Sequence, residues 1–438
     1  MNNFDFATRP LFASQRAATL QALARAGRPP LDRFINIVGD SRQANAIGGT
    51  PPTETHENYG IAAWLPFYTG GRVRIGAARK SATPGYTSKQ VLDNMDTYIA
   101  AGGDVFFNLY CTNDRNPTNA FPLGTSKKNL EAGLRKQIDA GKIPIMLAEL
   151  PRGGEYALSG EQLSYHLAMR EWQLTRLPEM GVRVGDAWPY LVDPDNEHLA
   201  LPRPELYVDQ LHLNGIGAPL AVRAVAHHFI DLFGVPLELP TYDSPFDATY
   251  NPRGWLTSNP LLLGTSGTKN GTANATGPLA TGFSLAGTNW TGATVTLFQE
   301  PSPLGGNYQG FELGGTPTAA GSTLIMEQVI PLANVTAGDI IRAVALTAFE
   351  NLQGVGGVSI DVRFVRGGNV YYVKSLDRYA EGSPMWVGPG IGPQETPFLT
   401  ADPTTDTEIK MRAVIYGCQN VPIRGTVRIG NLGCQKVL

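Results

Sequence analysis

The stretch Arg33-Phe-Ile-Asn-Ile-Val-Gly-Asp-Ser-Arg42 joins a short apolar run to a glycine and then to three polar residues. An apolar run of this length that ends at a turn residue is typical of a buried β-strand. Further along, similar runs alternate with segments that carry apolar residues at helical spacing. Such alternation predicts a mostly parallel sheet with helices on both faces. Because ligands of such sheets bind beyond the carboxyl ends of the strands, we expect the functional residues to follow the apolar runs.

The expected elements extend to about residue 235. Strands are expected at residues 33–38, 72–75, 104–110, 142–147 and 182–184. Helices are expected at residues 88–100, 126–140, 159–178 and 216–233, where apolar residues recur at i, i+3 and i+4. Residues 1–30 form an amphipathic segment punctuated by arginine, which we expect to be helical. This segment has no apolar h-region, so we do not expect it to be a Sec signal peptide.

The composition of the chain changes near residue 240. All six histidines precede this position, and five prolines lie between residues 236 and 260. The later runs are rich in Val, Ile and Thr, are bounded by Gly, Pro and Asn, and have almost no helical periodicity. We therefore expect an α/β domain over residues 1–240, a linker over 241–260, and an all-β domain, a β-sandwich or jelly roll, over 261–438. The Gly- and Thr-rich stretch 264–277 is predicted to be a surface loop.

Charge and cysteine content exclude several classes of protein. The 438 residues carry a net charge of −3 and contain no basic tract, so nucleic acid is not an expected partner. No apolar stretch approaches the ~18 residues of a membrane span, so we expect no membrane insertion. Three cysteines are too few for a disulfide framework. Cys418 and Cys434 flank the last strand-like run, and could be either a pair or two independent buried thiols.

Three polar clusters could meet at one edge of the predicted sheet. Gly39-Asp40-Ser41 directly follows the first strand, and Asn113-Asp114 follows the third. Asp209 and His212, three residues apart, precede the last helix. A serine nucleophile needs a base to take its proton and a carboxylate to orient that base. Ser41, His212 and Asp209 therefore predict a triad for acyl transfer, whereas each cluster alone would be an ordinary turn or surface pair.

Over about residues 30–235 these motifs resemble those of the SGNH, or GDSL-like, hydrolase family. The resemblance implies a flavodoxin-like, three-layer αβα fold, with Ser41 as nucleophile and no metal or cofactor. It also implies that the backbone N–H groups of Ser41 and Gly85 and the side-chain amide of Asn113 form the oxyanion hole. Arg42 stands where the name-giving motif has leucine. Cys111 stands where the third block usually has glycine, so we expect the loop that aims Asn113 to have a different shape.

The rim of the expected site is polar. Arg42, Asn45, Asp114 and Arg152 are expected to bind substrate, because such groups suit sugar hydroxyls, and no apolar lid for an acyl chain is evident. The β-domain resembles carbohydrate-binding modules, and residues 259–268 and 328–339 resemble segments of phage tail-associated proteins. We therefore expect an esterase that removes O-acetyl groups from a bacterial surface polysaccharide.

The same resemblance predicts a virion protein of a phage tail, which forms a homotrimer or binds other tail proteins. Two alternatives stay open. One is a bacterial carbohydrate acetylesterase that acts on plant or microbial glycans. The other is a non-catalytic, glycan-binding tail protein with a vestigial site. Hydrolysis of a small acetyl ester would separate the enzymes from the binding protein.

Overall fold

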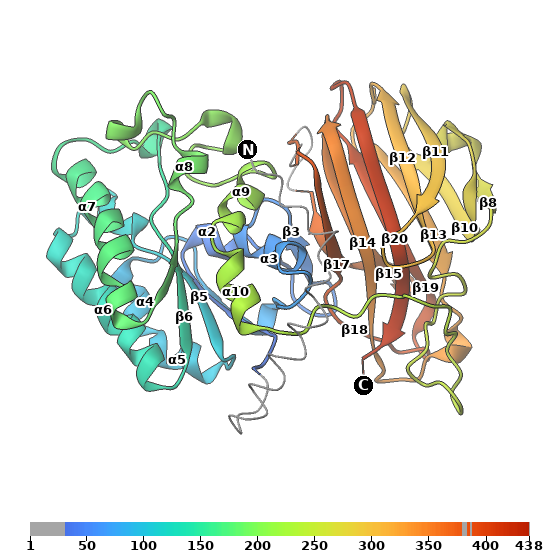
Figure 1. Cartoon of the computed structure of the whole chain (residues 1–438), viewed down its shortest axis with the longest axis horizontal. Coiled ribbons are helices and arrows are strands. Elements are labelled where there is room, and N and C mark those ends of the chain that lie inside the picture. Colours follow the sequence, from blue (N-terminus) through green and yellow to red (C-terminus); the bar gives the residue numbers. More distant parts are fainter. Residues whose placement is uncertain (1–30, 379–382, 386–387, 438) are drawn as a thin grey trace. The chain divides into compact units, whose positions relative to one another are not determined.

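The computed structural model describes residues 31–378, 383–385 and 388–437. The expected helical segment in residues 1–30 lies outside this range. Within it the chain forms two compact units. The α/β unit contains residues 31–47 and 59–236, and the β unit contains residues 48–58 and the described residues from 237 onward (Figure 1). In the described residues, no helix is long and apolar enough to cross a membrane.

A parallel sheet forms the centre of the α/β unit. Its strands, in spatial order, are β4 (Lys80–Ala82), β1 (Asn36–Gly39), β5 (Val105–Leu109), β6 (Ile143–Leu147) and β7 (Arg183–Gly185). Gly39 at the end of β1 lies opposite both Ala82 and Leu109, the last residues of its two neighbours. The loops that follow these three strands therefore leave the sheet at the same edge.

Helices cover both faces of this sheet. They are α4 (Ser88–Asp93), α5 (Met95–Ala100), α6 (Leu123–Asp139), α7 (Gly160–Arg176), α9 (Gly217–Arg223) and α10 (Ala226–Leu232). Adjacent residues of β5 point to opposite faces. Phe106 packs in one core cluster with Leu130 and Leu134 of α6, whereas the ring of Phe107 meets Phe229 of α10 edge-on at 5.5 Å. The predicted αβα arrangement is confirmed.

Two details of the α/β unit differ from expectation. The strand beside β1 is residues 80–82, whereas the expected strand at residues 72–75 contributes only an isolated bridge between Arg74 and Phe34. Ser81 and Ala82 are small, and the strand has no apolar run to reveal it. The helices predicted over 88–100 and 216–233 are each divided in two, the first at Asn94, which ends α4 and precedes α5.

The β unit consists of two mainly antiparallel sheets. The first contains, in order, β3 (Thr55–Glu57), β16 (Asn369–Asp377), β15 (Val355–Arg366), β19 (Asp406–Gly417), β13 (Thr323–Val329), β10 (Leu279–Thr288) and β8 (Ser266–Lys269), with β2 (Ile47–Gly48) beyond β3. The second contains β17 (Gly390–Glu395), β14 (Ile340–Gln353), β20 (Arg424–Lys436), β12 (Asn307–Gly315), β11 (Ala293–Pro301) and β9 (Ala275–Thr276), and β18 (Leu399–Thr400) pairs with β14. The predicted all-β region is confirmed, and the jelly-roll topology stays a prediction.

Three segments of the β unit depart from the sequence-based description. The stretch expected as a linker packs against strands: Leu256 N–H donates to Cys434 O at 2.7 Å, and Trp255 is buried beside Val344. The stretch expected as a surface loop, 264–277, supplies the short strands β8 and β9. Residues 48–58, from the loop after β1, carry β3, which pairs in parallel with β16. Cys418 and Cys434 are both buried, and they do not form a disulfide with each other.

Candidate active site

Ser41 lies immediately beyond β1, at the start of a short helix, α2 (Ser41–Ala44). A Cβ atom on Gly39 would lie 2.1 Å from the carbonyl oxygen of Leu109, so only glycine lets the chain pass this close to β5. The Asp40 side chain then accepts a hydrogen bond from Arg42 N–H and caps the helix. The Gly-Asp-Ser sequence therefore fixes the position from which Ser41 projects.

Ser41, His212 and Asp209 form a continuous hydrogen-bonded line. Ser41 Oγ is 2.7 Å from His212 Nε2, and His212 Nδ1 is 2.7 Å from Asp209 Oδ2. An ionised carboxylate can only accept, so the proton of the neutral imidazole belongs on Nδ1 and Nε2 is left to accept from the Ser41 hydroxyl. The side chains of His212 and Asp209 are 22% and 34% exposed, so the line is open to a substrate.

The turn that carries Asp209 and His212 is held from within. Asp209 Oδ1 accepts from the backbone N–H groups of Leu211 and His212, at 3.0 and 2.7 Å. Gln210 between them has a φ of 63°, and Gly153 N–H donates to its carbonyl. Partial burial raises the pKa of Asp209, but the hydrogen bonds from His212 and Leu211 outweigh it and hold that pKa below its usual value. The carboxylate is therefore ionised wherever the triad could work.

A hydrogen bond joins Asn113 to the turn that contains Gly85, the other expected oxyanion donor outside the triad. Thr83-Pro-Gly-Tyr86 forms a turn in which Tyr86 N–H donates to Thr83 O, and Gly85 has the φ of +80° that a type II turn requires at this position. Asn113 Nδ2 donates to Tyr86 O at 3.0 Å. This bond uses one of the two amide hydrogens and leaves the second for another acceptor.

Cys111 occupies a strained backbone position in the loop that precedes Asn113. Its φ is 112°, in the region that favours glycine, so a glycine could adopt this backbone conformation with less strain. The side chain is 1% exposed and packs in the core cluster beside Tyr110. Burial raises the pKa of the Cys111 thiol, and this favours the neutral, inert form. The expected difference in loop shape from the family stays a prediction.

Three of the four residues expected to bind substrate are instead buried within the protein. Arg42 pairs with Asp40 at 2.7 Å and with Glu149 at 3.1 Å. Asp114 accepts from Ser88 N–H at 2.7 Å. Since the protein itself engages the guanidinium of Arg42 and Oδ1 of Asp114, we assign these two residues a positioning role.

Arg152 is the third of them, with four hydrogen bonds to neighbouring loops. Asn45 is half-buried at the end of α2 and stays a candidate for substrate contact.

Two neighbours of the triad were missed at the sequence level. The ring of Tyr156 stands edge-on to His212 at 6.5 Å. Glu149 completes the buried ion pair of Arg42, and this pair raises the pKa of Arg42 although burial opposes it. Glu149 follows the fourth predicted strand, so its place at the strand end was a signal. Within the described ranges no group of three His, Cys, Asp or Glu side chains is arranged to hold a metal ion.

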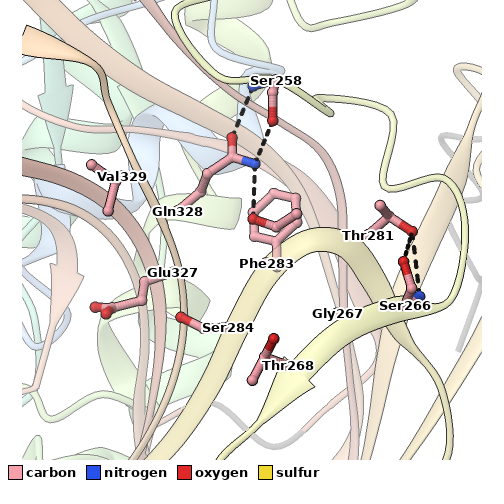
Figure 2. Close-up of a pocket in the computed structure, with 11 residues that line it drawn as sticks. Ser258, Ser266, Gly267, Thr268, Thr281, Phe283, Ser284, Glu327, Gln328 and Val329 are labelled. Atoms are coloured by element: carbon pink, nitrogen blue, oxygen red, sulfur yellow. Dashed lines mark hydrogen bonds between the residues drawn. The ribbon is translucent and has the colours of Figure 1, made fainter.

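The β unit carries a separate groove of about 510 Å³. It lies where the pairing of β8 with β10 shifts register between Leu279 and Ser284. Figure 2 shows that Gln328 bonds to Ser258 and that Ser266 bonds to Thr281, so hydrogen bonds fix its wall. The lining residues are mostly polar: Ser258, Ser266, Gly267, Thr268, Thr281, Gly282, Phe283, Ser284, Glu327, Gln328 and Val329.

Comparison with known proteins gives structural likenesses only. No family model and no curated protein matches the sequence. Similar solved structures include a GDSL-like lipase from Bacteroides thetaiotaomicron, which is 13% identical in sequence. The match covers 52% of this chain and 98% of the lipase chain, with a TM-score of 0.36. A lipase/acylhydrolase from Enterococcus faecalis is 17% identical, and the match covers 47% of this chain and 100% of the other, with a TM-score of 0.34. A psychrotrophic esterase from Pseudoalteromonas is also 17% identical, and the match covers 46% of this chain and 97% of the other, with a TM-score of 0.31.

These three solved structures are described as a GDSL-like lipase, a lipase/acylhydrolase and an esterase. Each of the three is covered almost completely by about half of this chain. At these identities and TM-scores the likeness concerns the backbone fold and says nothing of the reaction. The chemistry proposed below therefore depends on the side chains of this protein.

Proposed function

We propose that the α/β unit is a serine esterase. The observation that carries the proposal is the line from Ser41 Oγ through His212 to Asp209, with 2.7 Å at each step. A hydroxyl paired with an oriented neutral imidazole is the arrangement that nucleophilic acyl transfer needs. The three residues come from separate parts of the sequence. An ordinary turn and an unrelated surface pair would not bring their side chains together.

The reaction follows from these positions. His212 Nε2 takes the proton of Ser41 as Oγ bonds to the ester carbonyl carbon, and negative charge develops on the carbonyl oxygen. The backbone N–H groups of Ser41 and Gly85 and the second amide hydrogen of Asn113 are the proposed donors to that oxygen. When the carbonyl re-forms, the ester C–O bond breaks and His212 gives its proton to the leaving alcohol. Water then attacks the acyl-serine by the same route and releases the acid.

The test of the esterase is hydrolysis of p-nitrophenyl acetate by the full chain. Ser41→Ala is expected to reduce turnover to background, because no nucleophile remains. The matched control is Ser164→Ala, an exposed serine on α7 outside the triad, which should leave turnover unchanged. Full turnover by Ser41→Ala would contradict the mechanism. A wild-type protein without activity would favour the glycan-binding alternative with a vestigial site.

For the substrate we propose an O-acetylated polysaccharide. The groove of the β unit supports this, since its serine, threonine, glutamine and glutamate side chains are the groups that bind sugar hydroxyls. The expected glycan is that of a bacterial surface, and the expected context is a phage tail, in which copies of the chain form a homotrimer. Two likenesses support this context, those of residues 259–268 and 328–339 to tail-associated proteins.

Acetate release distinguishes the possible substrates. The full chain should release acetate from an acetylated bacterial capsule or O-antigen more rapidly than from acetylated xylan, and the opposite order would favour a plant-glycan esterase. Thr268→Trp would fill the groove without touching the triad. It should therefore weaken glycan binding and leave p-nitrophenyl acetate hydrolysis unchanged. Equal glycan binding by this variant would show that the polymer lies elsewhere.

A further inference from the structure

Arg152 is 2% exposed, and its guanidinium contacts the loop that carries Asn113. It follows β6, whereas the loop that it contacts follows β5. Its Nη1 donates to Thr112 O at 2.8 Å and to Thr112 Oγ1 at 3.1 Å. Its Nη2 donates to Asn116 Oδ1 at 2.9 Å. A buried cation is costly unless it is well bonded, so this interaction contributes more than a surface contact would.

The hydrogen bonds continue from Asn116 to the proposed oxyanion donor. Asn116 Nδ2 donates to Asn113 Oδ1 at 3.1 Å, and Asn113 Nδ2 donates to Tyr86 O at 3.0 Å. Arg152, Asn116, Asn113 and the carbonyl of Tyr86 thus form one chain of hydrogen bonds, which we name the amide relay.

The two ends of the amide relay fix its direction. A guanidinium has five donors and no acceptor, so Arg152 must face the oxygen of Asn116. The NH2 group of Asn116 then faces Asn113, and Asn113 must present its oxygen there. At the other end the Tyr86 carbonyl can only accept. The NH2 group of Asn113 is therefore turned toward the Gly85 turn, where the oxyanion would form.

We propose that Arg152 is a positioning residue for the esterase reaction: through Asn116 it sets which way the Asn113 amide points. This inference rests on the proposed function and adds a residue outside the expected triad and oxyanion hole. Without a donor at position 116, Asn113 could rotate and turn its carbonyl oxygen toward the developing negative charge. Burial lowers the pKa of Arg152 to about 10, so the group still carries its charge in the neutral range.

Asn116→Asp is the decisive variant, since a carboxylate keeps the acceptor for Arg152 and removes the donor to Asn113. We expect kcat for p-nitrophenyl acetate to fall about tenfold to a hundredfold, part of the full loss of an oxyanion donor, with KM within about threefold. Arg152→Met should act in the same direction. Thr112→Val, which removes only the 3.1 Å contact to Arg152, is the matched control and should change kcat less than about threefold.

A double-mutant cycle separates the amide relay from the added charge. If Arg152 and Asn116 act through Asn113, then in an Asn113→Ala background either change should lower kcat by less than about threefold. A charge or a folding defect would lower kcat as much in that background as in the wild type. Full additivity would overturn the proposal.

Side-chain amide NMR tests the amide relay without any turnover. In the full chain labelled with ¹⁵N-asparagine, the NH2 pair missing in Asn113→Ala identifies Asn113. We expect these signals to shift or broaden in Asn116→Asp and in Arg152→Met, and to stay in place in Thr112→Val. Unchanged signals in Asn116→Asp would overturn the amide relay. Shifted signals in a protein without esterase activity would support the amide relay and refute the proposed function.

Discussion

At Cys111 we expect the glycine variant to be more stable than the alanine variant, which is the reverse of the usual order of stability. Glycine ordinarily costs about 0.5–1 kcal/mol relative to alanine, because the unfolded chain loses more freedom. At Cys111, however, φ is 112°, and a residue with a Cβ atom held in such a conformation costs about 1–3 kcal/mol. The difference leaves Cys111→Gly more stable than Cys111→Ala by about 1 kcal/mol. Both variants lose the packing of the buried sulfur, so this loss cancels in the comparison.

Denaturant and thermal unfolding of the two variants test this order. For a unit of about 200 residues, 1 kcal/mol corresponds to a difference in Tm of about 2–4 °C. Because the backbone already follows a glycine path, Cys111→Gly should also keep kcat within about twofold of the wild type. An alanine variant as stable as the glycine variant would refute the strain at position 111. A large loss of kcat in Cys111→Gly would show that the sulfur itself positions Asn113.

Three further predictions follow from the same structure. Asp209→Asn should lower kcat about 10⁴-fold and keep the fold, because an amide oxygen can still accept from the backbone of the turn while its NH2 group favours the wrong tautomer of His212; activity within tenfold would contradict this. Burial lowers the pKa of His166 to about 3, so between about pH 6.5 and pH 3 the unfolded chain binds a proton that the native chain does not. The free energy of unfolding should therefore decrease as the pH is lowered through this window, by about 3 kcal/mol at pH 4.5. In urea titrations His166→Gln should remove that part of the acid sensitivity, and an unchanged dependence of stability on pH would contradict the prediction. A chain that ends at Pro236 should hydrolyse a small ester but be cut by protease within residues 48–58, since β3 has lost β16; cleavage as slow as in the full chain would contradict this.

The sequence was informative where chemistry depends on motifs at strand ends. Ser41, Asp209 and His212 could be placed because each follows a recognisable apolar run or precedes a helix. The sequence did not reveal that Arg42 and Arg152 turn inward, because a guanidinium is exposed unless acidic or carbonyl partners surround it. Those partners, Glu149 and Thr112 O, lie beyond the ends of β6 and β5, 107 and 40 residues away in the sequence.

The β unit shows the corresponding limit for strands. β12 contains three glycines within Asn307–Gly315, so its composition resembles a turn, and only pairing with β11 and β20 identifies it as a strand. Residues 72–75 gave the opposite error, since Val73 and Ile75 alternate with two arginines as in a strand but form only an isolated bridge. Local composition predicted core positions well and strand partners poorly, because partners are chosen by residues far away in sequence.

The strand β3 has a consequence for the order in which this protein can mature. Asn58, at the end of the segment that contains β3, donates to Gly356 O, 298 residues later in the chain. At 5–20 residues per second the ribosome needs roughly 15–60 s to deliver that partner. During this interval residues 48–58 are already synthesised and have no sheet to join. The nascent chain therefore exposes an unpaired strand, a few residues after Ser41 in the sequence, until the last fifth of translation. Fusion or circular permutation that shortens this delay should increase soluble yield.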